Sequence, residues 1–420
     1  MSATSHPTTS PWAALTASGA LWPVLASALG RLPIAMIGLA TLLYVQRVTG
    51  SFGTAGLVSA GTLVGTAVGS TLQGRLADRL GPTRPLLVAA VLFAAAVTML
   101  VLAVEARASL FVLISASMAV GLFMPGLPGV SRALWSDLVP PGPRRDAAYN
   151  YEAISFEVFF ILGPAIAALL ATGPWAGTGL VTAGLAMLTG TVLFALSPVA
   201  RARRPGAVRP PSVAAAAGRR LLGALADPGM RTVALASLGF GVVIGVVEVG
   251  VPASTTAAGA PQLGGVLLSL WSVTSVVAGL LYARWPWPRP LGLRMPALLA
   301  GFGLAVAAMA AANGVLALAA LMLLAGCLIT PQVTAHSLAV EVVAPASKAT
   351  EAFGWVITAA TLGLGGGQAA AGLLVEFGGP PAAFVAGGLG GLLLAAVLWV
   401  RRRTLAPQPA TARQVAGAPA

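Results

Sequence analysis

The sequence predicts an all-α integral membrane protein with 12 transmembrane helices in two pseudo-symmetric six-helix bundles. The first observation behind this prediction is composition, because the 420 residues are 57% hydrophobic and only 8% charged, whereas soluble domains average about 25% charged residues. The second is length, because the apolar runs are roughly 20 residues long, as a helix needs to cross a hydrocarbon core. The third is that basic residues gather at the ends of those runs.

The surroundings of most of the chain must be lipid. A mean hydropathy of +0.90 leaves too few polar residues to cover a water-facing surface, and in lipid the backbone must bond to itself in helices or a closed barrel. The apolar runs are continuous and do not alternate over about ten residues, which favours helices over barrel strands. The expected spans are residues 21–45, 51–73, 85–104, 109–131, 151–171, 175–197, 232–251, 262–283, 295–313, 315–340, 350–374 and 380–400.

The distribution of basic residues predicts the orientation. If both termini are cytoplasmic, 21 of the 24 Lys and Arg residues lie at inner ends of spans, Arg47 and Arg107 lie outside, and Arg31 lies within the first span. This asymmetry is the one expected of membrane proteins. The net charge of +13 therefore does not indicate a nucleic-acid partner, because the charge is spread over span ends and forms no single basic face.

The spans divide the chain into five regions. We expect a disordered cytoplasmic N-tail (1–20), an N-terminal six-helix bundle (21–197), a cytoplasmic linker (198–230), a C-terminal six-helix bundle (231–400) and a cytoplasmic C-tail (401–420). The N-tail lacks the positive region and the cleavage site of a signal peptide. Two interpretations of the linker stay open, namely a short interfacial helix around 213–225 and a disordered connector.

The two bundles are related by an internal repeat. A shift of 204 residues overlays Asp137 on Glu341, Arg144 on Lys348 and Gly163 on Gly367, together with several small and apolar residues. Paired charges at corresponding loop edges favour duplication over chance.

A charged segment, residues 74–84 (GRLADRLGPTR), joins the second and third spans. It resembles the loop signature of the major facilitator superfamily of secondary transporters, matching it at Gly74, Leu76, Ala77, Asp78, Arg79 and Gly81, while Pro82 and Thr83 replace the usual basic pair. The resemblance implies two six-helix halves around an axis along the membrane normal. It also implies a conformational latch formed by Gly74, Asp78, Arg79, Gly81 and Arg84.

Arg31 is the most unusual residue of the first span. A charge about 15 Å deep costs at least about 2.5–3.5 kcal/mol unless it faces a cavity or a partner. Glu157 lies at a comparable depth in span 5, which enters from the same side, so we expect an Arg31–Glu157 pair beside the central cavity. The pair is either purely structural or serves as a gate, a proton site or a substrate site. Pro33 is expected to bend the helix locally.

Gly163-Pro164 in span 5 is similar to the Gly-Pro core of a motif in drug–proton antiporters of this superfamily, where small residues permit a bend and close helix contact. Those antiporters usually carry an arginine in span 4, four residues before a glycine. Here the residue four positions before Gly121 is Ser117, so proton coupling by the usual arginine is not expected, and Arg31 is the residue that could substitute for it.

Glu248 near the outer end of span 7 is a further candidate for coupling or cation recognition, against the alternative of a solvated helix end. His336 is either a ligand or proton site, or a histidine bonded to a neighbouring carbonyl. A single cysteine, Cys327, suggests neither a disulfide nor a metal site, and no cofactor is expected.

The leading function is proton-coupled export of a small amphipathic or cationic compound by alternating access, in a bacterial cytoplasmic (inner) membrane. The expected partners are a small-molecule solute, protons and the lipid bilayer, with no nucleic acid, and the working unit is expected to be a monomer. An uptake carrier or facilitator for a small nutrient is the alternative. A non-transporting receptor or a membrane enzyme fits less well, because the sequence has no catalytic cluster at the membrane edge, and no enzymatic activity is expected.

Overall fold

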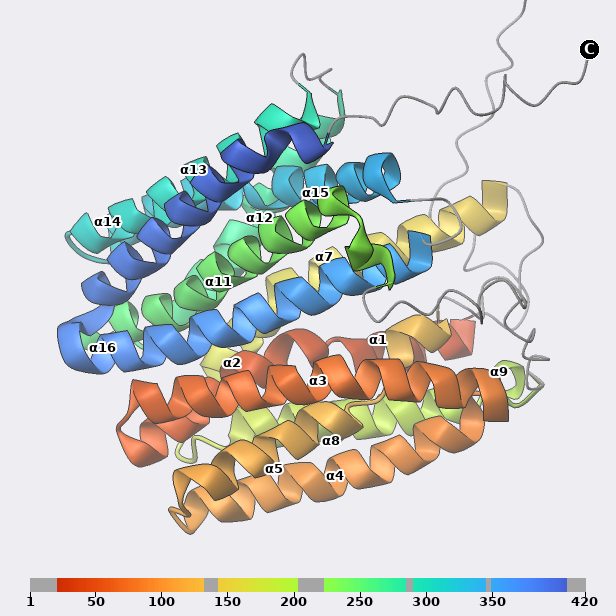
Figure 1. Cartoon of the computed structure of the whole chain (residues 1–420). Coiled ribbons are helices and arrows are strands. Elements are labelled where there is room, and N and C mark those ends of the chain that lie inside the picture. The colour runs from red at the N-terminus through yellow and green to blue at the C-terminus, as the bar shows by residue number, and fades with distance from the viewer. Residues whose placement is uncertain (1–20, 132–142, 203–222, 285–289, 345–348, 406–420) are drawn as a thin grey trace, which may run out of the picture. The chain divides into compact units, whose positions relative to one another are not determined.

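The computed structural model describes residues 21–131, 143–202, 223–284, 290–344 and 349–405. The regular elements in these ranges are all helices (Figure 1). The α-helices are α1 (Leu21–Arg31), α2 (Ile34–Thr49), α3 (Phe52–Leu80), α4 (Thr83–Glu105), α5 (Leu110–Phe123), α7 (Pro143–Ala171), α8 (Thr178–Ala195), α9 (Pro198–Ala202), α11 (Pro228–Ala257), α12 (Leu263–Arg284), α13 (Leu291–Ala308), α14 (Val315–Gly326), α15 (Ile329–Val343) and α16 (Ala349–Arg401), with short 3-10 turns η2 (Gly223–Ala226), η3 (Met309–Ala311) and η5 (Arg402–Leu405).

Within the described ranges, 11 stretches are long and apolar enough to cross a membrane. The last of them, Ala352–Leu405, is 54 residues long, and a straight helix of that length would measure about 80 Å, against roughly 30 Å for a hydrocarbon core. Gly379 (φ 71°, ψ 179°) breaks α16, and the chain reverses direction within this element (Figure 1). The break lies between the two last expected spans, 350–374 and 380–400.

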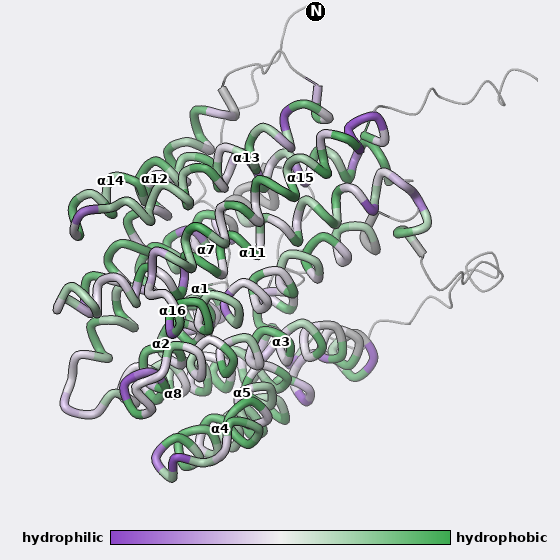
Figure 2. The backbone as a smooth tube through the Cα atoms, turned by 60° about the vertical axis from the view of Figure 1, so that its left-hand side comes forward, coloured by the Kyte–Doolittle hydropathy of each residue, from purple (hydrophilic) through white to green (hydrophobic). Residues whose placement is uncertain are grey.

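Hydrophobic residues run along the helices, and hydrophilic residues gather mainly at helix ends and turns (Figure 2). The first span is interrupted at Leu32 and Pro33, between α1 and α2, which agrees with the bend expected at Pro33. The turn at Gly314 has a left-handed φ of 96°, as glycine allows. The expected linker helix around 213–225 lies almost entirely outside the described residues.

Internal contacts divide the chain into two compact units. The first comprises Met1–Pro210 and Val251–Ser272, and the second comprises Pro211–Gly250 and Val273–Ala420. The segment Val251–Ser272, from the end of α11 and the first part of α12, thus groups with the first unit. The five regions expected from the sequence, with a bundle boundary in the linker, stay a prediction.

Glycines bring α3 and α5 into direct backbone contact in the first unit. A Cβ atom at Gly65 would collide with the carbonyl oxygen of Met118, one at Gly69 with that of Leu122, and one at Gly121 with that of Thr62. Close backbone approach through small residues is how transmembrane helices gain packing energy without a hydrophobic driving force.

Replacing Gly65 by leucine is therefore expected to destabilise the protein by about 3 kcal/mol, the upper end of the usual overpacking range. Gly390→Leu is the matched control, because a Cβ atom there meets nothing within 4 Å. Thermal unfolding of the detergent-purified variants, followed by size-exclusion chromatography, measures the difference. Equal midpoints for both variants would contradict the contact.

The second unit repeats one glycine contact of the first. A Cβ atom at Gly163 of α7 would collide with Ala35 of α2, and one at Gly367 of α16 would collide with Val242 of α11. Gly163 and Gly367 are the two glycines that the shift of 204 residues overlays. Equivalent glycines thus make equivalent helix contacts within each unit, which is what duplication of a helical bundle would produce.

Candidate functional site

A buried ion pair joins α1 to α7 inside the first unit. Nη1 of Arg31 lies 2.6 Å from Oε2 of Glu152, and the two side chains are 1% and 7% exposed. Nη2 of Arg31 also donates to the Glu152 carbonyl oxygen at 3.3 Å. The other carboxylate oxygen accepts from the Ser131 hydroxyl at 2.7 Å. Both oxygens of Glu152 and two nitrogens of Arg31 are therefore bonded, which offsets part of the cost of burying the charges, while Nε of Arg31 is buried with no hydrogen-bond partner among the described residues.

Aromatic rings complete the surroundings of this arginine. The guanidinium carbon of Arg31 lies 4.2 Å from the ring centre of Phe156 and 5.7 Å from that of Phe159. A ring face attracts a cation, and the attraction grows when water is excluded. The sequence alone did not predict the contact of these two phenylalanines with Arg31.

The expected Arg31–Glu157 pair is wrong. The structure pairs Arg31 with Glu152, and Glu157 has an exposed side chain on α7. The reason is the start of the helix, which lies at Pro143 and not at residue 151. Arg31 lies ten residues after the start of α1, and Glu152 lies nine residues after the start of α7. Glu157 follows Glu152 by five residues, about 140° around the helix, and so lies on a different face.

Pro164 leaves a gap in the hydrogen bonding of α7 that serines of α12 fill. Proline has no N–H, so the Phe160 carbonyl loses its helical partner. The Ser272 hydroxyl shares its hydrogen between that carbonyl, at 3.4 Å, and the Leu268 carbonyl of its own helix, at 3.2 Å. The Ala165 N–H donates to the Ser269 hydroxyl oxygen at 3.1 Å. These residues belong to the same contact unit. Side chains of a neighbouring helix commonly satisfy backbone groups freed by proline in membranes.

Ser272→Ala is expected to destabilise the protein by about 1 kcal/mol, because it removes the substitute partner of a backbone carbonyl. In a Pro164→Ala background the same change should have little effect, since residue 164 then supplies the helical N–H. A double-mutant cycle on thermal unfolding of the purified protein measures this dependence. Additive effects of the two changes would contradict the assignment.

Glu248 lies within α11 in the second unit, and its contact is an amide. Nε2 of Gln368 on α16 donates to Oε2 of Glu248 at 2.7 Å. No basic group of the described residues forms an ion pair with Glu248. The helix continues to Ala257, so Glu248 lies nine residues, about 14 Å, from the helix end. It is deeper than the sequence suggested, close to half the thickness of a hydrocarbon core.

The latch segment is helical for most of its length. α3 runs through Leu80 and ends at Gly81, whose φ of 78° needs a glycine, whereas the sequence suggested that the helix ends near Gly74. Leu, Ala and Arg are good helix formers, so nothing before Gly81 stops the helix. Arg79 and Arg84 are exposed. The side chain of Asp78 lies outside the described residues, so its latch role stays a prediction.

Ser117 occupies a position with no room for a long side chain. It is fully buried and donates to the Val58 carbonyl at 2.7 Å, and a Cβ atom at Gly61 would come within 2.6 Å of its hydroxyl oxygen. An arginine at this position would have to force α3 and α5 apart. The close contact between α3 and α5 therefore requires a small residue here, where antiporters of this superfamily usually have an arginine.

His336 of α15 is buried among side chains of the second unit. Its Nε2 lies 2.9 Å from Nε2 of Gln332, and its Nδ1 lies 3.4 Å from the Ser237 hydroxyl. The sequence analysis offered a bond from His336 to a neighbouring carbonyl as one alternative, but the contacts of its ring nitrogens are with these two side chains. No group of three potential metal-ligating side chains occurs within the described residues.

The described part of the chain contains 11 apolar stretches long enough to span a membrane, which indicates a multi-pass helical membrane protein. The chain belongs to the Major Facilitator Superfamily, whose family model matches residues 14–345. No protein with a curated description matches the sequence.

Several solved transporters share the fold. A variant of the peptide transporter POT has a TM-score of 0.70 at 16% identity, covering 92% of this chain and 94% of that one. A bacterial homolog of the human lysosomal transporter Spinster, in an inward-facing and unoccupied conformation, has a TM-score of 0.67 at 15% identity, covering 93% and 98%. A variant of the nucleoside transporter NupG has a TM-score of 0.67 at 15% identity, covering 90% and 99%. At these identities the likeness concerns the fold alone.

Proposed function

We propose that the protein is a non-enzymatic secondary transporter that exports a small amphipathic or cationic compound in exchange for protons. Membership of a transporter superfamily supports the general class. The observation that carries the finer proposal is Glu248, a half-buried carboxylate nine residues inside the end of a spanning helix, with an amide partner. Ionisable residues inside membrane spans are costly, and they commonly mark ion or proton pathways.

Gln368 suits a carboxyl group that gains and loses a proton. Its amide nitrogen donates to the carboxylate, while its amide oxygen is buried with no hydrogen-bond partner among the described residues. An amide can donate through nitrogen or accept through oxygen. Rotation of the Gln368 amide would therefore allow it to accept from a protonated Glu248, so that both protonation states have a partner.

We further propose that the break at Gly379 makes α16 two crossings, which brings the spans to twelve in two six-helix bundles. Both termini would then lie in the cytoplasm of a bacterial cell, as the basic residues predict. Asp78, Arg79 and Arg84 would act as a cytoplasmic latch, since exposed pairs worth about 0–1 kcal/mol can bias states that differ by a few kcal/mol. The working unit would be a monomer.

The test of export is accumulation of labelled compounds by cells that express the protein. We expect lower accumulation of amphipathic cations in cells with the wild-type chain than in control cells, and loss of this difference when a protonophore collapses the proton gradient. Higher accumulation of a neutral or anionic nutrient on expression would instead favour the uptake carrier.

A further inference from the structure

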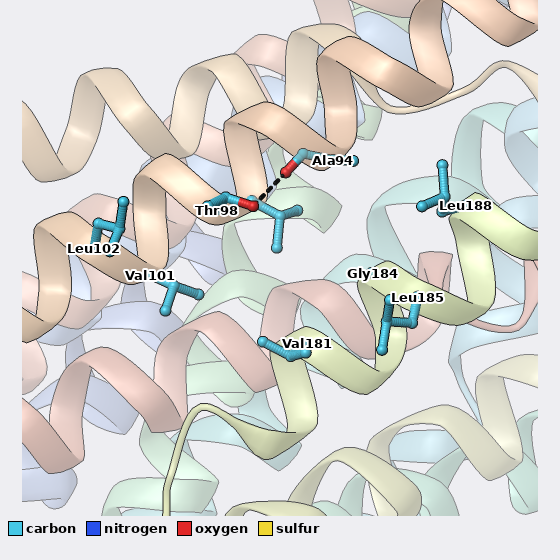
Figure 3. Close-up of a pocket in the computed structure, with 9 residues that line it drawn as sticks. Ala94, Thr98, Val101, Leu102, Val181, Gly184, Leu185 and Leu188 are labelled. Atoms are coloured by element: carbon cyan, nitrogen blue, oxygen red, sulfur yellow. Dashed lines mark hydrogen bonds between the residues drawn. The ribbon is translucent and has the colours of Figure 1, made fainter.

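A narrow apolar groove lies between α4 and α8 in the first unit (Figure 3). Its volume is about 260 Å³ and its lining comes from these two helices, below the roughly 300–1,000 Å³ of small-molecule sites. Gly184 lies between the larger side chains of Val181 and Leu185 in the lining of the groove. A Cβ atom there would meet Val97 at 3.4 Å, an ordinary contact, so a longer side chain at this position would have to displace Val97 or extend into the groove.

The groove lining is suited to a hydrocarbon chain, because it offers no free hydrogen-bond donor. The hydroxyl of Thr98 donates to the Ala94 carbonyl at 2.9 Å, so its hydrogen is not available to a ligand. The other lining residues are aliphatic or glycine. A polar molecule in the groove would lose hydrogen bonds to water without replacement, whereas an alkyl chain would lose nothing.

The groove lies in the outer half of the span under the proposed orientation, and aromatic residues mark that end. Oε1 of Glu105, the last residue of α4, accepts from the hydroxyl of Tyr44 and from the indole N–H of Trp175, each at 2.7 Å. Tyrosine and tryptophan concentrate at membrane–water interfaces. On α4 the lining runs from Leu102 to Ala94, so it begins about 5 Å inside the helix end and continues for about 12 Å. That depth is about half of a roughly 30 Å core, the thickness of one leaflet.

A cationic residue follows the same end of α4. Arg107 lies two residues beyond the end of α4, is exposed, and has a left-handed φ of 47°. Its guanidinium forms no ion pair with a described residue. Arg47, by contrast, is already bonded to the carbonyl oxygens of Ala171 and Gly173 at 2.6 and 2.8 Å. Arginine binds phosphate oxygens through charge-assisted hydrogen bonds.

We propose that this groove binds one phospholipid of the outer leaflet, with an acyl chain between α4 and α8 and the phosphate at Arg107. The groove faces outward, because Leu102 and Leu185 are 63% and 58% exposed. The lipid would lie against the groove lining at Gly184 and occupy a defined position on the surface of the first unit. This site is independent of the proposed proton coupling at Glu248.

Native mass spectrometry of the detergent-purified full chain, exchanged with a phosphatidylglycerol of defined mass, tests the proposal. We expect one tightly retained lipid on the wild type. Gly184→Leu should weaken retention about ten-fold, as blocking roughly two methylene contacts would do, and Arg107→Gln should weaken it as well. The matched controls Gly390→Leu and Arg403→Gln should retain lipid as the wild type does.

If Gly184→Leu fails to fold, Leu185→Phe on the exposed rim of the groove takes its place, and it should also weaken lipid retention. The proposal is overturned if folded groove variants and controls retain lipid equally, because the lipid would then be non-specific. It is also overturned if the retained molecule is not a phospholipid.

Discussion

Glu152→Ala is expected to destabilise the protein by about 3–5 kcal/mol, because it leaves the charge of Arg31 buried without a partner. The loss should be larger than for other single carboxylates of the chain, since Arg31 is 1% exposed and its ion pair is closed by Ser131. Thermal unfolding of the purified protein measures it. Glu157→Ala is the matched control on the same helix, and its exposed side chain should change stability by no more than about 0.5 kcal/mol.

A double variant distinguishes lost pairing from lost volume. Arg31→Met with Glu152→Leu should recover most of the stability lost in Glu152→Ala, because apolar replacement of a whole buried pair is often neutral. If Glu152→Ala unfolds at the wild-type temperature, or if Glu157→Ala is the more damaging change, the pairing of Arg31 with Glu152 is wrong.

Glu248→Gln is expected to abolish gradient-driven transport while leaving solute exchange intact. Glutamine can still bond to Gln368, but it cannot gain or lose a proton. Counterflow of labelled against unlabelled solute, which needs no proton, should continue in proteoliposomes, whereas accumulation driven by a pH gradient should fall to the level of protein-free vesicles. Glu341→Gln, at an exposed position near the end of α15, is the control and should behave as the wild type. If the Glu248→Gln variant still shows gradient-driven transport, Glu248 has no role in proton coupling.

The apolar runs of the sequence predicted most of the spanning stretches found among the described residues, since apolar length depends on the membrane alone, while the division of the last stretch into two spans stays a prediction. It was harder to predict from the sequence which residues pair with buried charges. The depth of Glu152 depended on where α7 begins, and eight residues of polar sequence from Pro143 onward belong to that helix although they carry no apolar signal. The same limitation applied to Glu248, because α11 extends past Val251 to Ala257.

Contacts between distant helices could be predicted only in part. The repeat of Gly163 and Gly367 was visible in the sequence, but their neighbours, Ala35 and Val242, follow from packing. Likewise, nothing near Ser272 in the sequence indicates that it would replace a bond lost at Pro164. Such pairings depend on the angle and register of two helices, which a single sequence with mostly Ala, Gly, Leu and Val in its spans does not define.

The most direct test of proton-coupled export is proton movement in inside-out vesicles that contain this protein. A pH gradient, acidic inside, is imposed, and amphipathic cations, neutral compounds and anions are added in turn. We expect an amphipathic cation to collapse the gradient in wild-type vesicles and not in Glu248→Gln vesicles. Solute entry with an unchanged gradient would contradict proton coupling and identify a facilitator.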